Sequence, residues 1–233
     1  MTEIKAYIFD VFGTIVDWRT GVANEAERFF MTRDIEIDSA DFADRWRGKY
    51  QPAMERIRSG NRGYVALDTL HLENLDELLL EMGIESEISN SDKLILNRAW
   101  EKLPPWPDSV PGLNALKKKA IIAPCSNGSI ALMTRLAKFG NLPWDCIVGA
   151  EIANNYKPHP DAYIKSVAAL GLKPQEVMMV AAHNDDLLAA RKNGLKTAFI
   201  PRPSEHGEGQ TTDLKATEQW GYTIDSIGEL SRL

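Results

Sequence analysis

Five short apolar runs, each followed by a turn and then by residues with helical periodicity, set the fold class of this chain. The runs are AYIFD (6–10), AIIAPC (120–125), CIVGA (146–150), VMMVAA (177–182) and TAFIP (197–201). Most of them are apolar throughout, which is typical of parallel strands whose two faces are both covered by helices. Start and stop residues such as Ser129 and Gly194 predict helices at about 129–139, 160–170 and 184–193. The pattern therefore predicts an α/β fold.

The long stretch between the first two apolar runs has a different pattern. Phe42, Trp46, Tyr50, Met54 and Ile57 recur at helical spacing, and LDTLHLENLDELLLEMG and DKLILNRAWEKL continue the pattern. The proline-rich segment LPPWPDSVPG (103–112) then returns the chain to the sheet. We predict a core with a parallel, Rossmann-like sheet at 1–17 and 101–233, and an inserted all-helical cap at 18–100.

Composition and charge limit the class of partner. The chain has 233 residues, 44% of them hydrophobic, which is enough for a large core. A net charge of −6 argues against a nucleic-acid or membrane-surface partner, since both demand a dense cationic face. Cys125 and Cys146 lie in or beside apolar runs and predict buried thiols in a reducing compartment. We see neither a leader nor an apolar run of about 20 residues, and we expect a cytoplasmic protein.

Polar residues follow several of the predicted strands. Asp10 ends the first run, Ser126 and Asn127 end the second, and further polar residues stand in the loop to Lys157 and at 182–186. Ligands of open parallel sheets bind beyond the carboxyl ends of the strands. We therefore expect these side chains to converge on one crevice.

Four ordered motifs carry a resemblance to a known family. They are FDVFGT (9–14), SNGS (126–129), YKPHPDAY (156–163) and VAAHNDDLLAAR (180–191), arranged around a helical cap. In this order they resemble the haloacid dehalogenase superfamily, and within it the L-2-haloacid dehalogenases (type II), over essentially the whole chain. The resemblance implies metal-independent hydrolysis of short 2-haloalkanoic acids, such as haloacetates and L-2-haloacids, to 2-hydroxy acids. It also implies a covalent ester on Asp10 and no organic cofactor.

Two positions depart from the phosphatases of this superfamily. Phe12 stands where a phosphatase carries the aspartate that protonates the leaving oxygen, and a halide needs no such proton. Ala182 stands where a magnesium-dependent member carries a metal-binding aspartate, and alanine offers no hard oxygen ligand. Both departures favour dehalogenation. A magnesium-dependent small-molecule phosphohydrolase and a non-catalytic small-anion binder remain as alternatives.

The resemblance implies a role for each core residue that matches a motif. Asp10 attacks the halogen-bearing carbon, and Lys157 holds this nucleophile and offsets its charge. Thr14 hydrogen-bonds Asp10 or supports the turn. Ser126 and Asn127 offer a hydroxyl, an amide and helix N-terminal N–H groups to the substrate anion, or else simply cap the helix.

Matching residues on the cap and around the crevice imply further contacts. Arg47, in DRWRGKY, matches the arginine that receives the departing halide, with Arg45 as the alternative. Phe12, Trp18 and Trp46 are bulky neighbours of the site and are predicted to limit substrate size if they face the crevice. Tyr163 matches a family tyrosine and is predicted to contact the substrate, although a packed ring with a satisfied hydroxyl is the alternative.

The water step is the least determined by the sequence. Asp186 matches the aspartate associated with the hydrolytic water, whereas Asp185 is expected to face solvent. His183 departs from the better-known dehalogenases, which carry asparagine there, and an imidazole could share the base role or orient Asp186. We predict no metal site, because the other three histidines show no ligand spacing. Apolar cap helices leave a homodimer possible.

Overall fold

A six-stranded sheet forms the centre of the computed structural model, which describes residues 3–232. Its strand order is β3-β2-β1-β4-β5-β6, and every neighbouring pair runs parallel. The strands are β1 (Ala6–Phe9), β2 (Ile121–Ser126), β3 (Val148–Gly149), β4 (Val177–Ala181), β5 (Lys196–Phe199) and β6 (Tyr222–Thr223). The predicted α/β class is confirmed. The chain passes to opposite sides of β1, so the carboxyl end of β1 is a point at which a crevice opens.

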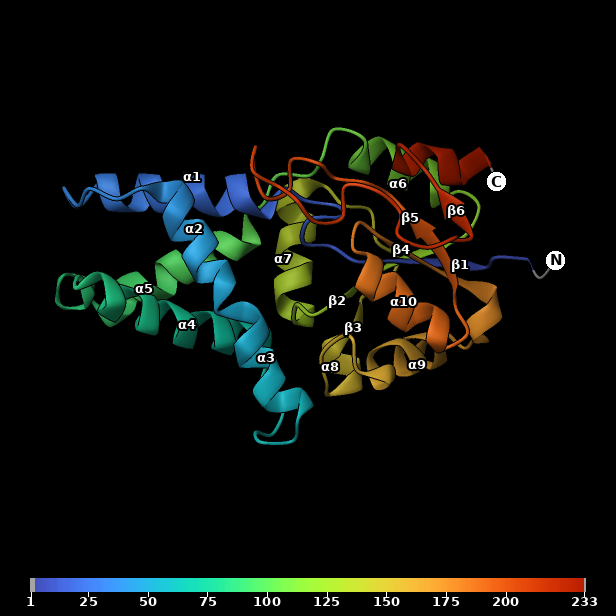
Figure 1. Ribbon diagram of the computed structural model, residues 1–233, viewed down its shortest axis with the longest axis horizontal. Helices are drawn as coiled ribbons and strands as arrows, with labels where there is room; N and C mark the ends of the chain where they lie inside the picture. Colours follow the sequence, from blue (N-terminus) through green and yellow to red (C-terminus); the bar gives the residue numbers. More distant parts are fainter. Residues whose placement is uncertain (1–2, 233) are drawn as a thin grey trace.

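The apolar runs are buried on both faces, as the pattern predicts. Along β1, Tyr7 and Phe9 belong to one buried apolar cluster, whereas Ala6 and Ile8 belong to a second cluster on the other face. Helices α6 (Ser109–Leu116) and α7 (Ile130–Gly140) pack on the first face, and α9 (Pro160–Ala169) and α10 (Asn184–Lys192) pack on the second (Figure 1). The short helix α8 (Ala150–Ala153) follows β3. Because each strand buries both faces, continuous apolar runs were required at these positions.

Two edge elements differ from the prediction. Strand β3 has two residues where a run of five was predicted, and Cys146 before it is exposed, so the prediction of two buried thiols is wrong for this cysteine. Strand β6 was not predicted, because its two residues are exposed and carry no apolar pattern. Both strands lie at the edges of the sheet, where fewer neighbours cover the side chains. Sequence patterns driven by burial are weakest at such positions.

Residues 18–101 contain helices and turns and no strand. The α-helices are α1 (Trp18–Met31), α2 (Ser39–Gly48), α3 (Tyr50–Arg58), α4 (Leu67–Met82) and α5 (Asn90–Asn97). Figure 1 shows them together on one side of the sheet, with α7 between. One buried cluster contains both Phe9 of the sheet and Trp46 of α2, so apolar packing alone draws no boundary there. The predicted cap boundary at 18–100 stays a prediction. No helix within residues 3–232 has the length and apolarity to span a bilayer.

The proline-rich return segment anchors the turn after β1. Its Trp106 donates from Nε1 to the carbonyl of Gly13 at 2.8 Å, and its backbone N–H donates to the carbonyl of Ile15 at 3.0 Å. Ser109, at the start of α6, donates its hydroxyl to the same Ile15 carbonyl at 2.7 Å. These bonds fix the loop that carries Asp10 and Thr14. The segment therefore supports the site as well as closing the helical insert.

Candidate active site

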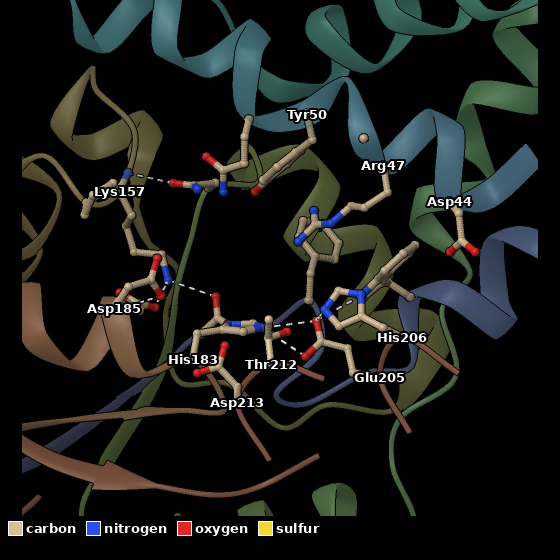
Figure 2. Close-up of a pocket in the computed structure, with 18 of the residues that line it drawn as sticks. Asp44, Arg47, Tyr50, Lys157, His183, Asp185, Glu205, His206, Thr212 and Asp213 are labelled. Atoms are coloured by element: carbon tan, nitrogen blue, oxygen red, sulfur yellow. Dashed lines mark hydrogen bonds and ion pairs between the residues drawn. The ribbon is translucent and has the colours of Figure 1, made fainter. Parts of the chain in front are cut away.

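A cavity of about 610 Å³ opens at the carboxyl ends of β1 and β4, beneath helices α2 and α3. Figure 2 shows Arg47 and Tyr50 reaching into it from the helices above, and Lys157, His183 and Glu205 from the sheet side. The wall is mixed in character, with aromatic rings from Phe12, Trp18 and Tyr50 beside several ionisable groups. Further lining residues include Asn127, Pro158, Tyr163, Asp185, Asp186 and His206. The predicted convergence at the strand ends is therefore present.

Asp10 is one of the carboxylates that line the cavity. It is 8% exposed, and Lys157 Nζ lies 2.8 Å from its Oδ1. Its Oδ2 accepts a hydrogen bond from Thr14 Oγ1 at 2.7 Å and lies 3.2 Å from His183 Nδ1. Burial alone would raise the pKa of Asp10, but the charges of Lys157 and His183 outweigh burial and hold this pKa well below its usual range. The carboxylate is therefore ionised at neutral pH and partly shielded from water.

Thr14 joins the turn after β1 to the end of β4. Its hydroxyl donates to Asp10 and accepts from the backbone N–H of Ala182 at 2.9 Å. Position 182 thus contributes a backbone donor to the site and no carboxylate. Phe12 is 3% exposed and presents a ring to the cavity, so position 12 contributes no acid either. Both departures found in the sequence lie at the site itself.

Lys157 bridges two carboxylates. Its Nζ lies 2.8 Å from Asp10 Oδ1 and 2.5 Å from Asp186 Oδ2, and its side chain is 6% exposed. Burial alone would lower the pKa of Lys157, but the two carboxylates outweigh burial and raise it above its usual value. The backbone is held from both sides, because Asn127 Oδ1 accepts from the Lys157 N–H at 2.8 Å and Arg58 donates to its carbonyl at 3.0 Å. The ammonium group is charged and fixed in place.

Asp186, in the first turn of α10, has a partner on each oxygen. Tyr163 donates its hydroxyl to Oδ1 at 2.5 Å, and Lys157 occupies Oδ2. Burial raises the pKa of Asp186 and the Asp10 charge adds to this effect, while Lys157 opposes it. Burial also raises the pKa of Tyr163, so its hydroxyl keeps the proton that it donates. Tyr163 lines the cavity, but its hydroxyl is committed to Asp186.

His183 connects Asp10 to a residue that the sequence did not single out. Its Nδ1 faces Asp10, while Nε2 lies 3.0 and 3.1 Å from the two carboxylate oxygens of Glu205. Glu205 is 1% exposed, and Trp18 donates from Nε1 to its Oε1 at 3.0 Å. Burial alone would lower the pKa of His183, but the Glu205 and Asp10 carboxylates raise it well above its usual value. Glu205 lies in the polar segment PRPSEHGEGQTTD (201–213), which has neither periodicity nor a motif that could have drawn attention to it.

Arg47 reaches the cavity from the end of α2 and has no ion-pair partner in the described part of the chain. Its guanidinium carbon lies 4.0 Å from the ring centroid of Tyr50, 5.2 Å from that of Trp18 and 5.8 Å from that of Phe12. Its buried Nη1 has no hydrogen-bond acceptor among residues 3–232. Arg45, the alternative, pairs instead with Asp41 at 3.8 Å and Glu81 at 3.3 Å. Of the two arginines, Arg47 alone offers an unused donor to an anion in the cavity.

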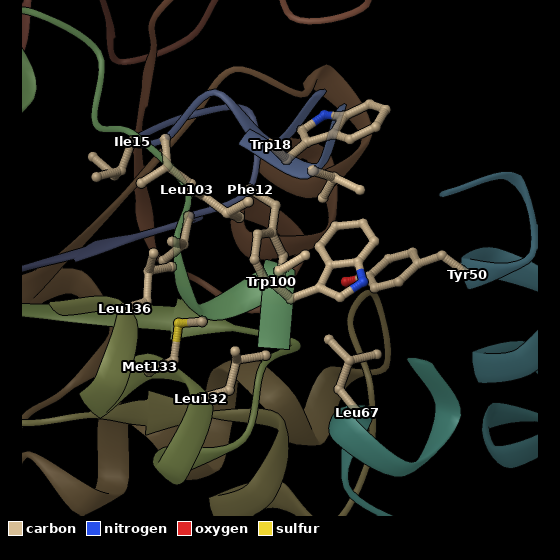
Figure 3. Close-up of a cluster of buried hydrophobic side chains, with 14 of the residues drawn as sticks. Phe12, Ile15, Trp18, Tyr50, Leu67, Trp100, Leu103, Leu132, Met133 and Leu136 are labelled. Atoms are coloured by element: carbon tan, nitrogen blue, oxygen red, sulfur yellow. The ribbon is translucent and has the colours of Figure 1, made fainter. Parts of the chain in front are cut away.

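Two predicted substrate contacts lie elsewhere. Trp46 is fully buried in the aromatic packing of the helices and donates from Nε1 to the His71 carbonyl at 2.9 Å. Trp18, which the sequence also named, lines the cavity wall, and Tyr50 lies there in place of Trp46. Ser126 is 1% exposed, and its hydroxyl accepts from the Gly128 N–H at 3.0 Å, so it shapes the turn before α7. We correct both predictions: neither side chain lines the cavity. Figure 3 shows Phe12 and Trp18, which line the cavity, beside Trp100 in the buried apolar cluster.

Comparisons with known proteins agree with this geometry. Residues 4–194 match the family model of the haloacid dehalogenase-like hydrolases. The (S)-2-haloacid dehalogenase of Xanthobacter autotrophicus is 29% identical over 206 residues, which cover 87% of this chain and 77% of the relative. (S)-2-haloacid dehalogenase 1 of Pseudomonas sp. (strain CBS-3) is 28% identical over 236 residues, covering 100% of this chain and 97% of the relative.

Two crystal structures superpose closely on this chain. A defluorinating L-2-haloacid dehalogenase matches with a TM-score of 0.96 and 49% identity, covering 98% of this chain and 94% of that one. A second L-2-haloacid dehalogenase matches with a TM-score of 0.95 and 41% identity, covering 98% and 97%. Phosphatases are also similar: the phosphoglycolate phosphatase of Aquifex aeolicus is 25% identical over 199 residues, 84% of either chain.

Proposed function

The chain belongs to the haloacid dehalogenase-like hydrolases, and from this premise we propose that it hydrolyses the carbon–halogen bond of short 2-haloalkanoic acids to give 2-hydroxy acids. One observation carries the proposal above all. The cavity is lined by a buried, ionised carboxylate, Asp10, and by the guanidinium of Arg47, which has no ion-pair partner in the described part of the chain. Position 12 contributes a phenyl ring and no acid. This set suits attack on carbon with loss of a halide. The L enantiomer is the expected substrate wherever the carbon is chiral.

The first half-reaction is covalent. Asp10 attacks the halogen-bearing carbon from the side opposite the halide, with inversion, and forms an ester. Lys157 Nζ, 2.8 Å from Asp10 Oδ1, keeps the carboxylate ionised, and Thr14 Oγ1, 2.7 Å from Oδ2, orients it. Aromatic walls limit water near the nucleophile, which strengthens electrostatic interactions there. The halide leaves toward Arg47, whose guanidinium is permanently charged and lies between aromatic rings.

The substrate carboxylate requires donors that the catalytic groups have not already used. Asn127 lines the cavity, and its Oδ1 accepts from the Lys157 N–H, so its Nδ2 is directed as a donor. Residue Asn127 also stands before α7, whose N-terminus favours an anion. Of the two substrate contacts that the sequence suggested on this loop, we therefore keep Asn127 and not Ser126. Phe12, Trp18 and Tyr50 set the size of the acyl chain that fits.

The second half-reaction cleaves the ester. Water attacks the carbonyl carbon of alkylated Asp10, breaks its bond to the substrate oxygen and releases the 2-hydroxy acid. The product oxygen therefore comes from Asp10, and the water oxygen enters the Asp10 carboxylate. His183 Nδ1 lies 3.2 Å from Asp10 Oδ2, whereas Asp186 contacts Asp10 only through the Lys157 ammonium group that both carboxylates share.

A magnesium-dependent phosphohydrolase is the main competing function, given the 25% identical phosphatase relative. Such an enzyme needs an acid for the leaving oxygen and hard oxygen ligands for the metal. Positions 12 and 182 offer a phenyl ring and a backbone N–H. A non-catalytic anion binder gains nothing from crowding the ionised Asp10 beside an anionic ligand. Neither alternative uses the whole set of residues in the cavity.

The deciding experiment follows an isotope through one turnover. The protein is mixed with less than one equivalent of L-2-chloropropionate in ¹⁸O-water that contains a chelator, so that each active site turns over at most once. The mass of the proteolytic peptide that contains Asp10 is then measured by mass spectrometry. We expect one ¹⁸O in the Asp10 carboxylate, unlabelled lactate and free chloride, and no chloride from Asp10→Asn. Label in the lactate with an unlabelled Asp10 would exclude the covalent route. Chelator-sensitive hydrolysis of phosphate esters without halide release would favour the phosphohydrolase.

Two further predictions concern the surroundings of the enzyme. The sequence left a homodimer possible, and we propose that it forms through exposed apolar side chains on α1 and α5, namely Met31, Leu94 and Ile95, because association would remove them from water. Light scattering of the purified chain would give twice the monomer mass, and the monomer mass would exclude it. The cytoplasmic location stays a prediction that fractionation of cells would test.

A further inference from the structure

Asp186 matches the family position associated with the hydrolytic water, but here each of its two oxygens already accepts a hydrogen bond. Its Oδ1 receives the Tyr163 hydroxyl and its Oδ2 the Lys157 ammonium, each at 2.5 Å, and its side chain is 9% exposed. If Asp186 took a proton from water, its charge would be neutralised and both of these charge-assisted bonds would weaken. Such bonds are about twice as strong as neutral hydrogen bonds. Asp186 is better placed to hold Lys157 than to act on water.

His183 lies against the reacting carboxyl group and is open to the cavity. Its Nδ1 is 3.2 Å from Asp10 Oδ2, and its side chain is 21% exposed. A water molecule that attacks the Asp10 carbonyl carbon would pass within hydrogen-bonding reach of this nitrogen. The other ring nitrogen is held by Glu205.

We propose that His183 is the general base for hydrolysis of the Asp10 ester and that Glu205 is the residue that positions it. The inference rests on the proposed dehalogenase function and deepens it. Glu205 does not reach the reacting atoms. It acts through the imidazole, as a carboxylate behind a histidine fixes the ring, selects the tautomer and stabilises the imidazolium.

Glu205 is itself rigidly placed. Trp18 donates to its Oε1 at 3.0 Å, so one oxygen is oriented by the indole while both face His183 Nε2. On the opposite side the carboxylate lies directly over Gly13, where an added Cβ would come within 2.0 Å of Oε1. Gly13 also has a positive φ of 89°. The turn after β1 and the C-terminal loop are thus built to fit one another around this carboxylate.

The charged groups around His183 determine when its imidazole gains and loses a proton during the reaction. Asp10 faces His183 from the turn after β1, and Glu205 faces it from the loop at 201–213. Other ionisable groups around the cavity are His206, Arg47, Lys157, Asp185 and Asp186. In the resting enzyme His183 is an imidazolium between Asp10 and Glu205, which raise its pKa. Alkylation converts Asp10 to a neutral ester and removes one of these anions. The pKa of His183 then falls, and its proton leaves to solvent through the exposed edge.

The hydrolytic step then balances. Neutral His183 takes a proton from water at Nδ1 while the oxygen bonds to the ester carbon of Asp10. Collapse of the tetrahedral intermediate breaks the bond to the substrate oxygen, which receives that proton. The Asp10 carboxylic acid so formed gives its own proton to His183, and the resting ion pair returns. Over the cycle, haloacid and water yield hydroxy acid, halide and one proton, and that proton is released before the ester is cleaved.

Rapid-quench kinetics with L-2-chloropropionate separate the two half-reactions. For His183→Ala we expect a burst of one chloride per active site, followed by accumulation of the ester on Asp10 and hydrolysis slowed about 100- to 10,000-fold. Free imidazole should restore part of the hydrolysis rate, which a purely structural role of His183 would not allow. Ester hydrolysis at the parent rate in His183→Ala would overturn the inference. A parent enzyme that releases no chloride would instead refute the proposed function.

Glu205→Gln tests the positioning role by a pH profile. Since Glu205 raises the pKa of His183, its neutralisation should move the acidic limb of ester hydrolysis down by about one pH unit, with a lower plateau rate. Glu208→Gln is the matched control: it removes the same charge from an exposed position of the same loop and should leave the profile unchanged. A lower rate in Glu205→Gln with an unmoved profile would overturn the proposed role of Glu205.

Discussion

Replacing Thr14 by valine would remove one hydroxyl from the site at nearly constant volume. That hydroxyl is fully buried, donates to Asp10 Oδ2 at 2.7 Å and accepts from the Ala182 N–H at 2.9 Å. A buried N–H left without a partner costs about 1–3 kcal/mol, and a hydrogen bond to a charged group contributes about 1.5–3 kcal/mol. Asp10 still interacts with Lys157 and His183 in the variant, so only part of the stabilisation from its bond to the hydroxyl is lost. The added methyl returns about 0.8 kcal/mol.

The expected result is a loss of about 2–3 kcal/mol in the free energy of unfolding. Urea unfolding at pH 7 measures it, and Thr14→Ser is the matched control. Serine keeps the hydroxyl and deletes a buried methyl, for which we expect a smaller loss of about 1 kcal/mol. The chloride burst should slow tenfold or more in the valine variant alone, because Asp10 loses a bond that orients it. If the two variants unfold within about 0.5 kcal/mol of each other, Thr14 does not join β1 to β4 as described.

Three further perturbations have clear expected outcomes. Arg47→Lys should retain the fold and lower the rate of the chloride burst about 10- to 100-fold, because an ammonium group fits the aromatic walls less well than a guanidinium; a parent-like burst would exclude Arg47 as the halide acceptor. Phe12→Asp should abolish halide release without creating magnesium-dependent phosphatase activity, since position 182 still lacks a carboxylate; phosphate release from small esters would contradict this. The pKa of His183 is higher in the folded protein than its value of about 6.5 in the unfolded chain, so protonation of His183 stabilises the fold. This contribution is complete below about pH 6.5 and is lost as pH rises through the folded pKa. Unfolding free energy measured from pH 6 upward should therefore decline, and His183→Ala should reduce that decline.

The helical region shows where reasoning from periodicity stops. Trp46 and Arg47 are neighbours in the sequence, and both were predicted at the cavity. In α2 they point in different directions, so Trp46 packs among buried rings while Arg47 reaches the cavity. An aromatic-rich helix covered on more than one side gives no sequence clue to which apolar face borders a ligand. Tyr50, which lies on α3, takes the place predicted for Trp46.

The sequence alone determined that the sheet is parallel, in which order strands β1 to β5 and the helices between them follow along the chain, and which residues local motifs place at strand ends. Asp10 could be predicted because its buried strand is apolar throughout and ends on a polar turn. The role of Lys157 was implied by the resemblance of YKPHPDAY to a family motif. The absence of acids at positions 12 and 182 was equally visible, since it requires only that the motif be aligned.

Only the tertiary structure decided which groups complete the site. Glu205 lies 187 residues from Trp18, its indole donor, and stands in a loop with no periodic pattern. Nothing local distinguishes it from exposed glutamates such as Glu208. Its burial, its bond to His183 and its close approach to Gly13 exist because the turn after β1 and the C-terminal loop meet in space. A side chain that gains its partners only through such long-range contacts leaves no local pattern in the sequence.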